Sequence, residues 1–289
     1  MVYTFILRCK KPVPLIHSCR KKEVSMSFKF CSFASGSSGN SYLVRSDETA
    51  IIIDAGISGK RIMEGLEYSG TAPEEVSAIL VTHEHSDHVQ SLKVLHKKLP
   101  EANTYSNFAT WENIQDRIPE GRHVAFESGD QFTIGDIEVK SFATHHDSSE
   151  SVCYSMNHDG KQITILTDTG HISEDIYNEI KGADILALEA NHDPNVLAMC
   201  RYPYYVKRRI LGDYGHLSNE AAAECIARLV EEDPKRRRVL LAHLSRENNS
   251  PEMALLTVRN YLGERGIFTG DELALDVLMR DEVSKIYIL

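Results

Sequence analysis

The sequence predicts a four-layer α/β fold, αββα, in which two β-sheets pack face to face and helices cover their outer sides. Segments with strand-like patterning come first and helical segments follow, and this order occurs twice along the 289-residue chain. Such an order suits two sheets that share one core. A hydrophobic content of 42% is enough for a large core. No stretch approaches the length that a membrane span needs, and no long linker or short repeat divides the chain.

Residues 1–25 differ in charge from the rest of the chain. They hold six basic residues and one acid, a formal charge of +5 within a total of −10, which leaves −15 for the remainder. Their apolar run is too short for a signal peptide, and strand-like patterning begins just after Met26. The six cysteines include no C-x-x-C pair, which favours reduced thiols in the cytoplasm. We therefore expect a cytoplasmic protein with a disordered basic extension over 1–25 and a single domain over 26–289.

In the first half of the chain, continuous apolar runs mark strands, and apolar residues three or four apart mark helices. A Ser/Gly loop over residues 34–40 joins the first two strands. It can approach an anion through its backbone N–H groups or serve as an ordinary hairpin loop. The expected strands are 28–33, 41–45, 50–53 and 78–81, and the expected helices are 58–69, 73–76, 89–99 and 107–116.

In the second half, Gly-Asp pairs at 129–130 and 135–136 and a His-Asp-Gly segment at 158–160 mark turns between strands. Ser218 can cap the helix that follows it. The expected strands are 122–127, 131–134, 137–142, 152–157, 162–167, 184–189, 238–242, 273–278 and 285–289. The expected helices are 173–181, 195–211, 218–232 and 250–264.

Three histidines and a carboxylate stand within six residues, in the H-x-H-x-D-H run of His83, His85, Asp87 and His88. The run follows the buried strand 78–81, which would deliver it to that strand's C-terminal end. Imidazole nitrogen and carboxylate oxygen suit Zn, Mn or Fe. His83 and His85 can chelate one ion, and Asp87 and His88, past a bend, can turn toward a second. A solvated polar loop is the alternative, and the position after a strand disfavours it.

Further candidate ligands also follow predicted strands. One of His145 and His146 supplies a third imidazole, Asp168 is the natural bridging carboxylate, and His243 is a last candidate. Each alone could be a hydrogen-bonded loop residue. Because strands of a sheet can aim side chains at a common edge, their joint occurrence favours a metal site with two ions. Asp54, in Ile-Ile-Ile-Asp-Ala-Gly, is another carboxylate at a strand end.

With these residues in view, the chain resembles the metallo-β-lactamase-fold hydrolases, and more closely their YycJ/WalJ group. The closer resemblance covers about residues 26–289 and rests on FASGSSGN at 33–40, LEANHD at 188–193, GHLSN at 215–219 and LAHLSRENN at 241–249. It implies a first metal on His83, His85 and His146. It implies a second metal on Asp87, His88 and His243, with Asp168 bridging and Asp54 bracing the metal loop through hydrogen bonds. His146 is preferred to His145 because the family pattern favours the histidine of a His-Asp pair.

The resemblance also implies a phosphodiesterase or nuclease, most closely a 5′→3′ exonuclease that acts on DNA. His216, in Gly-His-Leu-Ser-Asn, is the candidate proton donor to the leaving oxygen, while Asp87 and Asp168 would act through the metals. A helix-entry histidine bonded to the backbone is the alternative for His216. His192 could support the metals or contact substrate.

Contact with the substrate, or support of the metal ligands from outside, is predicted for two segments. Ser37 and Asn40 belong to the Ser/Gly loop. Residues 201–209, RYPYYVKRR, form the chain's basic and aromatic cluster, in which Arg201, Lys207 and Arg208 could contact phosphates and tyrosines could stack on bases. An exposed helix face whose tyrosines pack inward is an equal alternative.

Two other functions stay open at the level of sequence. A small-molecule phosphodiesterase would suit the acidic chain better than a nuclease does. A regulator that binds a protein partner could keep the metal site without using it. Acyl transfer is disfavoured because it leaves His216 without a task.

Overall fold

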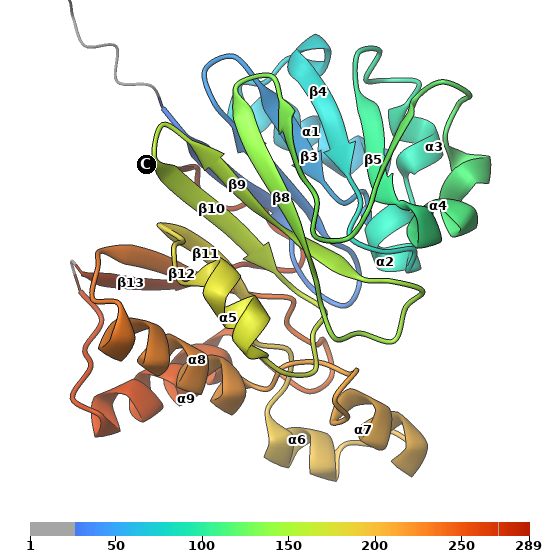
Figure 1. The fold of residues 1–289 in the computed structure, drawn as a ribbon. Coiled ribbons are helices and arrows are strands. Elements are labelled where there is room, and N and C mark those ends of the chain that lie inside the picture. The colour runs from blue at the N-terminus through green and yellow to red at the C-terminus, as the bar shows by residue number, and fades with distance from the viewer. Residues whose placement is uncertain (1–26, 271) are drawn as a thin grey trace, which may run out of the picture.

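Two β-sheets pack face to face between outer helices in the computed structural model, which describes residues 27–270 and 272–289 (Figure 1). The αββα class predicted from the sequence is confirmed. The predicted basic extension over 1–25 lies outside the described residues, so it stays a prediction, as does the single domain over 26–289. Within the described residues, no helix combines the length and apolar character that a membrane crossing requires.

Most predicted element boundaries fall within two residues of the observed ones, but the strand at Asn103–Asn107 was not predicted. The first sheet contains β1 (Lys29–Ala34), β2 (Ser41–Arg45), β3 (Ala50–Ile53), β4 (Val76–Leu80), β5 (Asn103–Asn107), β6 (His123–Phe126) and β14 (Tyr287–Ile288). The second contains β7 (Gln131–Ile134), β8 (Ile137–Ala143), β9 (Val152–His158), β10 (Lys161–Leu166), β11 (Ile185–Glu189), β12 (Arg237–Ala242) and β13 (Leu273–Val277).

The helices cover the outer faces of the two sheets. They are α1 (Gly59–Ser69), α2 (Ser86–Val89), α3 (Leu92–Leu95), α4 (Phe108–Ile114), α5 (Glu174–Ile180), α6 (Pro194–Met199), α7 (Tyr204–Ile210), α8 (Asn219–Glu232) and α9 (Pro251–Glu264). Two 3₁₀ turns lie at Pro73–Glu75 and Gln115–Arg117. Ser218 caps α8 as predicted, because its side chain accepts a hydrogen bond from the backbone N–H of Ala221.

Apolar side chains form three buried layers. The central layer lies between the sheets and includes Ile53, Ile165 and Leu240, all fully buried. A second layer fills the space between the first sheet and α1, α3 and α4. A third lies between the second sheet and α5, α8 and α9. Each sheet is therefore apolar on both faces, and polar groups concentrate at the strand ends.

The strand order brings several C-terminal strand ends to one edge of the sandwich. The first sheet has the order β14-β1-β2-β3-β4-β5-β6, with β3 to β6 parallel. The second has the order β13-β12-β11-β10-β9-β8-β7, with β10 to β13 parallel. β8 is antiparallel to β9, which is antiparallel to β10, so β8 and β10 run the same way. The polar residues that follow these strands can therefore meet.

Two predicted helices differ from the structure. The helix predicted over 89–99 is shorter, because the N–H of Ser91 bonds the carbonyl of Ala55 (2.9 Å) instead of continuing α2; Leu92, Leu95 and Leu99 still face the core. The helix predicted over 195–211 is divided into α6 and α7. Pro203 lies between them, and its ring and missing N–H are incompatible with a continuous helix.

Candidate metal centre

Backbone conformation at three strand ends turns side chains toward a common point. Asp54 follows β3, Asp168 follows β10 and His243 follows β12, and their φ angles are 60°, 57° and 53°. Residues with a Cβ rarely adopt this left-handed conformation, and such strain concentrates at functional sites. Among the described non-glycine residues, only Asp159, in a turn, shares it. The fold therefore holds these three residues at a steric cost.

Three imidazoles form one group of nitrogens. His83 Nε2 lies 3.1 Å from His85 Nδ1, and His146 Nε2 lies 3.3 Å from the same atom. Their ring centroids are 4.7 to 5.1 Å apart. His145 lies apart from this group and stacks on His171 instead, with 4.0 Å between ring centroids. Of the two candidate histidines at 145–146, the structure thus brings His146 to the group.

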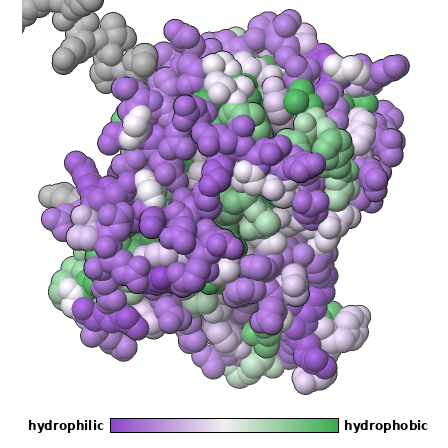
Figure 2. All heavy atoms as spheres, viewed as in Figure 1, coloured by the Kyte–Doolittle hydropathy of each residue, from purple (hydrophilic) through white to green (hydrophobic). Residues whose placement is uncertain are grey.

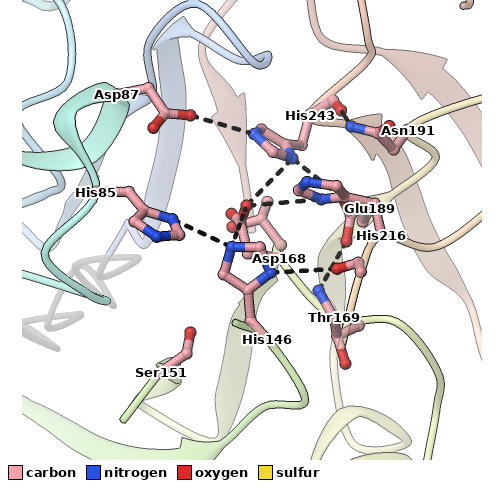
Figure 3. Close-up of polar contacts among 12 residues, drawn as sticks. His85, Asp87, His146, Ser151, Asp168, Thr169, Glu189, Asn191, His216 and His243 are labelled. Carbon is pink, nitrogen blue, oxygen red and sulfur yellow. Dashed lines mark hydrogen bonds and ion pairs between the residues drawn. The ribbon is translucent and has the colours of Figure 1, made fainter. Parts of the chain in front are cut away.

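Asp87, His88 and His243 form a second group. His88 Nε2 lies 3.6 Å and His243 Nε2 3.8 Å from Asp87 Oδ2. Asp168 lies between the groups, with Oδ1 3.7 Å from His146 Nε2 and Oδ2 3.3 Å from His88 Nε2. Figure 3 shows His85, His146, Asp168 and His243 turned toward one another across this space. The seven predicted ligands are therefore adjacent in the fold.

Hydrogen bonds fix the orientation of the imidazoles. His146 Nδ1 lies 3.1 Å from the carbonyl of Gly215, and His243 Nδ1 lies 3.0 Å from Glu189 Oε1. A carbonyl or carboxylate oxygen can only accept, so Nδ1 donates in both contacts and Nε2 is the nitrogen that faces the centre. Such outer partners are typical of metal-binding histidines.

Asp54 ties the loop of the H-x-H-x-D-H run to β3. Its Oδ1 accepts from the N–H of Thr82 (2.9 Å), and its Oδ2 accepts from His88 Nδ1 (2.7 Å). Asn40, in the Ser/Gly loop, approaches from the other side, with Nδ2 3.2 Å from His88 Nε2. Gly56 lies against the same loop, where an added Cβ would stand 1.5 Å from the carbonyl oxygen of Asp87. These contacts fit the predicted bracing role of Asp54.

The donor set fits a divalent cation. His243 Nε2 and Asp168 Oδ2 are buried and have no hydrogen-bond partner in the described part of the chain. Burial lowers the pKa of His83, so a neutral imidazole faces the centre. Burial also disfavours charge on His243, but neighbouring carboxylates, foremost Asp168, raise its pKa to about 10. The carboxylates around His243 therefore favour a positive charge next to them, which a bound metal ion would supply.

Glu189, at the end of β11, is a central residue that the sequence reasoning did not select. Its fully buried carboxylate accepts from His216 Nδ1 (2.8 Å), from His243 Nδ1 (3.0 Å) and from the N–H of Thr169 (2.9 Å). Burial alone would raise its pKa, but the two imidazoles hold the pKa of Glu189 below its usual value. The signal was present, because Glu189 is a carboxylate at the end of a predicted strand, like Asp54 and Asp168.

The remaining predicted residues lie around the centre rather than in it. His192 is buried, its ring nitrogens have no partner among the described residues, and burial lowers its pKa to about 4. Ser37 is exposed. Arg201 lines a cavity of about 440 Å³ beside α6, Lys207 donates to the carbonyl of Ala198 (2.6 Å), and Arg208 lies over the ring of Tyr204.

A family model described as "Beta-lactamase superfamily domain" matches residues 49–244. The protein is a member of this superfamily. The metallo-β-lactamase-fold protein YhfI from Bacillus subtilis superposes with a TM-score of 0.69 at 14% identity, covering 91% of this chain and all of its own, which agrees in fold alone. Membership makes the protein a metal-dependent hydrolase of the metallo-β-lactamase type.

Two relatives narrow the group within the superfamily. Exodeoxyribonuclease YycJ of Bacillus anthracis is 41% identical over 251 residues, which cover 85% of this chain and 93% of the relative. Exodeoxyribonuclease WalJ of Streptococcus pneumoniae is 38% identical over 250 residues, 85% and 92% of the two chains. The predicted resemblance to the YycJ/WalJ group is confirmed.

Proposed function

We propose that this metallo-β-lactamase-type hydrolase is a dinuclear phosphodiesterase that degrades DNA as a 5′→3′ exonuclease. The observation that carries the chemistry is the His216–Glu189 pair beside the two groups of ligands. The nucleic-acid substrate is supported by the two relatives named exodeoxyribonucleases, of which this chain covers 92% or more. The direction of digestion rests on the YycJ/WalJ resemblance.

Two sets of residues would hold the ions. His83, His85 and His146 form the first set, and Asp87, His88 and His243 form the second, with Asp168 common to both. When bound, divalent ions there would lower the pKa of water and neutralise negative charge on a phosphoryl oxygen. The set contains no cysteine, so Zn, Mn and Fe are all compatible with it.

His216 has the contacts of a proton donor. Its Nδ1 bonds the buried carboxylate of Glu189, which leaves Nε2 for a second partner. The side chain is one-fifth exposed, and its ring centroid lies 5.0 Å from that of His146 and 5.3 Å from that of His243. Glu189 stabilises positive charge on the ring. His216 can therefore hold a proton at Nε2 and transfer it to the leaving oxygen of a phosphodiester.

The test uses protein freed of metal and reloaded with Mn²⁺ or Zn²⁺. Substrates are 5′- and 3′-labelled single- and double-stranded DNA, the matching RNA, and bis(p-nitrophenyl) phosphate. We expect mononucleotides to leave the 5′ end of DNA, and Asp87→Ala and Asp168→Ala to abolish cleavage while the proteins stay folded by circular dichroism. Lys60→Gln, at an exposed position on α1, is the control and should cleave normally.

The other functions predict different results. Cleavage of the dye ester without cleavage of any nucleic acid would replace the nuclease by a small-molecule phosphodiesterase, which the formal charge of −10 suits. Absence of all hydrolysis in metal-loaded protein, with unchanged function of Asp168→Ala in cells, would instead support a non-catalytic regulator that binds a partner.

A further inference from the structure

Residues 194–214, which contain α6 and α7, form an arm with unusual exposure. Tyr204 is 76% exposed and Tyr205 74%, so the alternative in which these tyrosines pack inward is wrong. Met199 and Tyr214 are also exposed, and no residue of α7 is buried. In Figure 1 the two helices lie at the bottom of the view, below the sheets, and in Figure 2 that region mixes hydrophilic with pale and hydrophobic residues. Exposed aromatic groups gathered in this way indicate a binding surface.

The charge of the arm is opposite to that of the chain. The arm holds four basic residues, Arg201, Lys207, Arg208 and Arg209, and one acid, Asp213, a formal charge of +3 in a chain of −10. The ring of Tyr204 lies 6.0 Å from the guanidinium carbon of Arg208, which is one helical turn away. Aromatic rings combined with arginines match a polyanion that also carries aromatic bases. An acidic protein surface could also attract the positive charge of the arm. Its carboxylates, however, offer no flat ring on which the tyrosines can stack.

The arm joins the metal centre directly. Arg209 forms a two-point ion pair with Asp147, the neighbour of His146 in sequence, with Nη2 3.0 Å from Oδ1. The carbonyl of Ile210, the last residue of α7, accepts from the N–H of His216 (3.0 Å). Tyr205 precedes Arg209 by four residues and shares its helix face. At a rise of 1.5 Å per residue, Tyr205 lies about 6 Å along the helix from Arg209, the residue that contacts Asp147 beside the metal ligands.

We propose that the arm binds an unpaired DNA strand, with bases stacked on Tyr204 and Tyr205 and phosphates on Arg201 and Arg208, and so leads the strand to the metal centre. The inference rests on the proposed nuclease function and names the form of its substrate. Neighbouring bases cover both faces of each internal base in a duplex, so stacking of successive bases on Tyr204 and Tyr205 requires a strand that is unpaired near the site.

Binding is measured by fluorescence anisotropy, so that it does not depend on cleavage. The probe is a fluorescein-labelled thymidine 15-mer with phosphorothioate linkages, compared with the same length of blunt duplex. Tyr204→Ala/Tyr205→Ala should weaken binding of the single strand at least about 30-fold, since stacking is lost at two rings and each contributes at least about 5-fold. Tyr204→Phe/Tyr205→Phe keeps both rings and should bind like the natural protein. Tyr68→Ala, at an exposed tyrosine on α1 (57%), is the matched control.

Salt dependence tests the phosphate contacts. The slope of log affinity against log salt should decrease in magnitude by about 1.4 for Arg201→Gln/Arg208→Gln, since each phosphate contact to a single strand contributes about 0.7. Lys60→Gln/Lys93→Gln, on α1 and α3, removes two charges elsewhere and should leave the slope unchanged.

Several results would overturn the proposal. One is unchanged affinity and slope in the arm variants, and another is an equal loss of affinity for the blunt duplex. A dimer that Tyr204→Ala/Tyr205→Ala converts to monomer, with unchanged DNA affinity, would assign the surface to a second copy of the chain. DNA cleavage without dependence of binding on the arm would remove this inference and leave the nuclease standing. Arm-dependent binding of DNA without cleavage would instead remove the nuclease function and leave the arm as a DNA-binding surface.

Discussion

Replacement of Glu189 by Gln tests how the buried carboxylate acts on the centre. Glu189 accepts hydrogen bonds at 2.8 to 3.0 Å from His216, from His243 and from a backbone N–H. Gln has nearly the same shape, but one of its two acceptor oxygens becomes an N–H₂ donor. Whichever way the amide is turned, a donor then faces a donor. If the amide nitrogen faces the rings, both imidazoles lose their partner.

The expected loss follows from the strength of these bonds. A hydrogen bond to a charged group contributes about 1.5 to 3 kcal/mol. Loss of the bond that stabilises positive charge on His216 should therefore lower kcat by roughly 10- to 150-fold. The bond to His243 orients a predicted ligand, and loss of an outer partner typically lowers metal affinity by about 10- to 100-fold. Measurement at saturating metal separates the two effects.

The assay follows hydrolysis of bis(p-nitrophenyl) phosphate and of labelled DNA by four proteins: the natural protein, Glu189→Gln, His216→Ala and the double variant. If Glu189 acts on turnover through His216, its replacement should cost much less in the His216→Ala background. Metal affinity, measured by competition with a chromophoric chelator, should fall in both backgrounds because of His243. Unchanged kcat at saturating metal, or fully additive losses in the double variant, would refute this reasoning.

Three further predictions concern the metal sites and the fold. Elemental analysis should find two metal equivalents per chain in the natural protein and fewer in Asp168→Asn. EDTA should lower the unfolding midpoint of the natural protein more than that of Asp168→Asn, because metal stabilises only the folded state that binds it. Gly56→Ala should lower metal affinity, measured by competition with the chromophoric chelator. The added Cβ would stand 1.5 Å from the Asp87 carbonyl oxygen, so the loop that carries the H-x-H-x-D-H run must move. Gly263→Ala is the control, because a Cβ there meets open space and should leave metal affinity unchanged. Burial lowers the pKa of His96 from 6.5 to about 4, so the unfolded chain binds more protons between these values and stability falls as pH drops through this window. Thermal melts of metal-free protein should show a weaker pH dependence for His96→Gln than for the natural protein between pH 6.5 and 5, and parallel curves would contradict the assignment.

Much of the site could be predicted because its residues follow strands. A buried strand is recognisable from local patterning, and a polar residue directly after it is bound to lie at a sheet edge. Asp54, His83 and Asp168 were found in this way, and the H-x-H-x-D-H run added its neighbours. Glu189 obeys the same rule but was passed over, because the contacts that mark it, to His216 and His243, join residues far apart in the sequence and leave no local pattern.

The sequence by itself determined the αββα class, the order of most elements and the set of strand-end residues, because periodicity and strand ends are local properties of the chain. Only the tertiary structure decided which of two adjacent histidines joins the group, since His146 meets Gly215 and His145 meets His171 through contacts distant in sequence. It also decided that Glu189 joins His216 to His243, and that Tyr204 and Tyr205 face outward after Pro203 divides the predicted helix. Such pairings depend on how strands order themselves in the sheets, and that order is a long-range property that no local pattern contains.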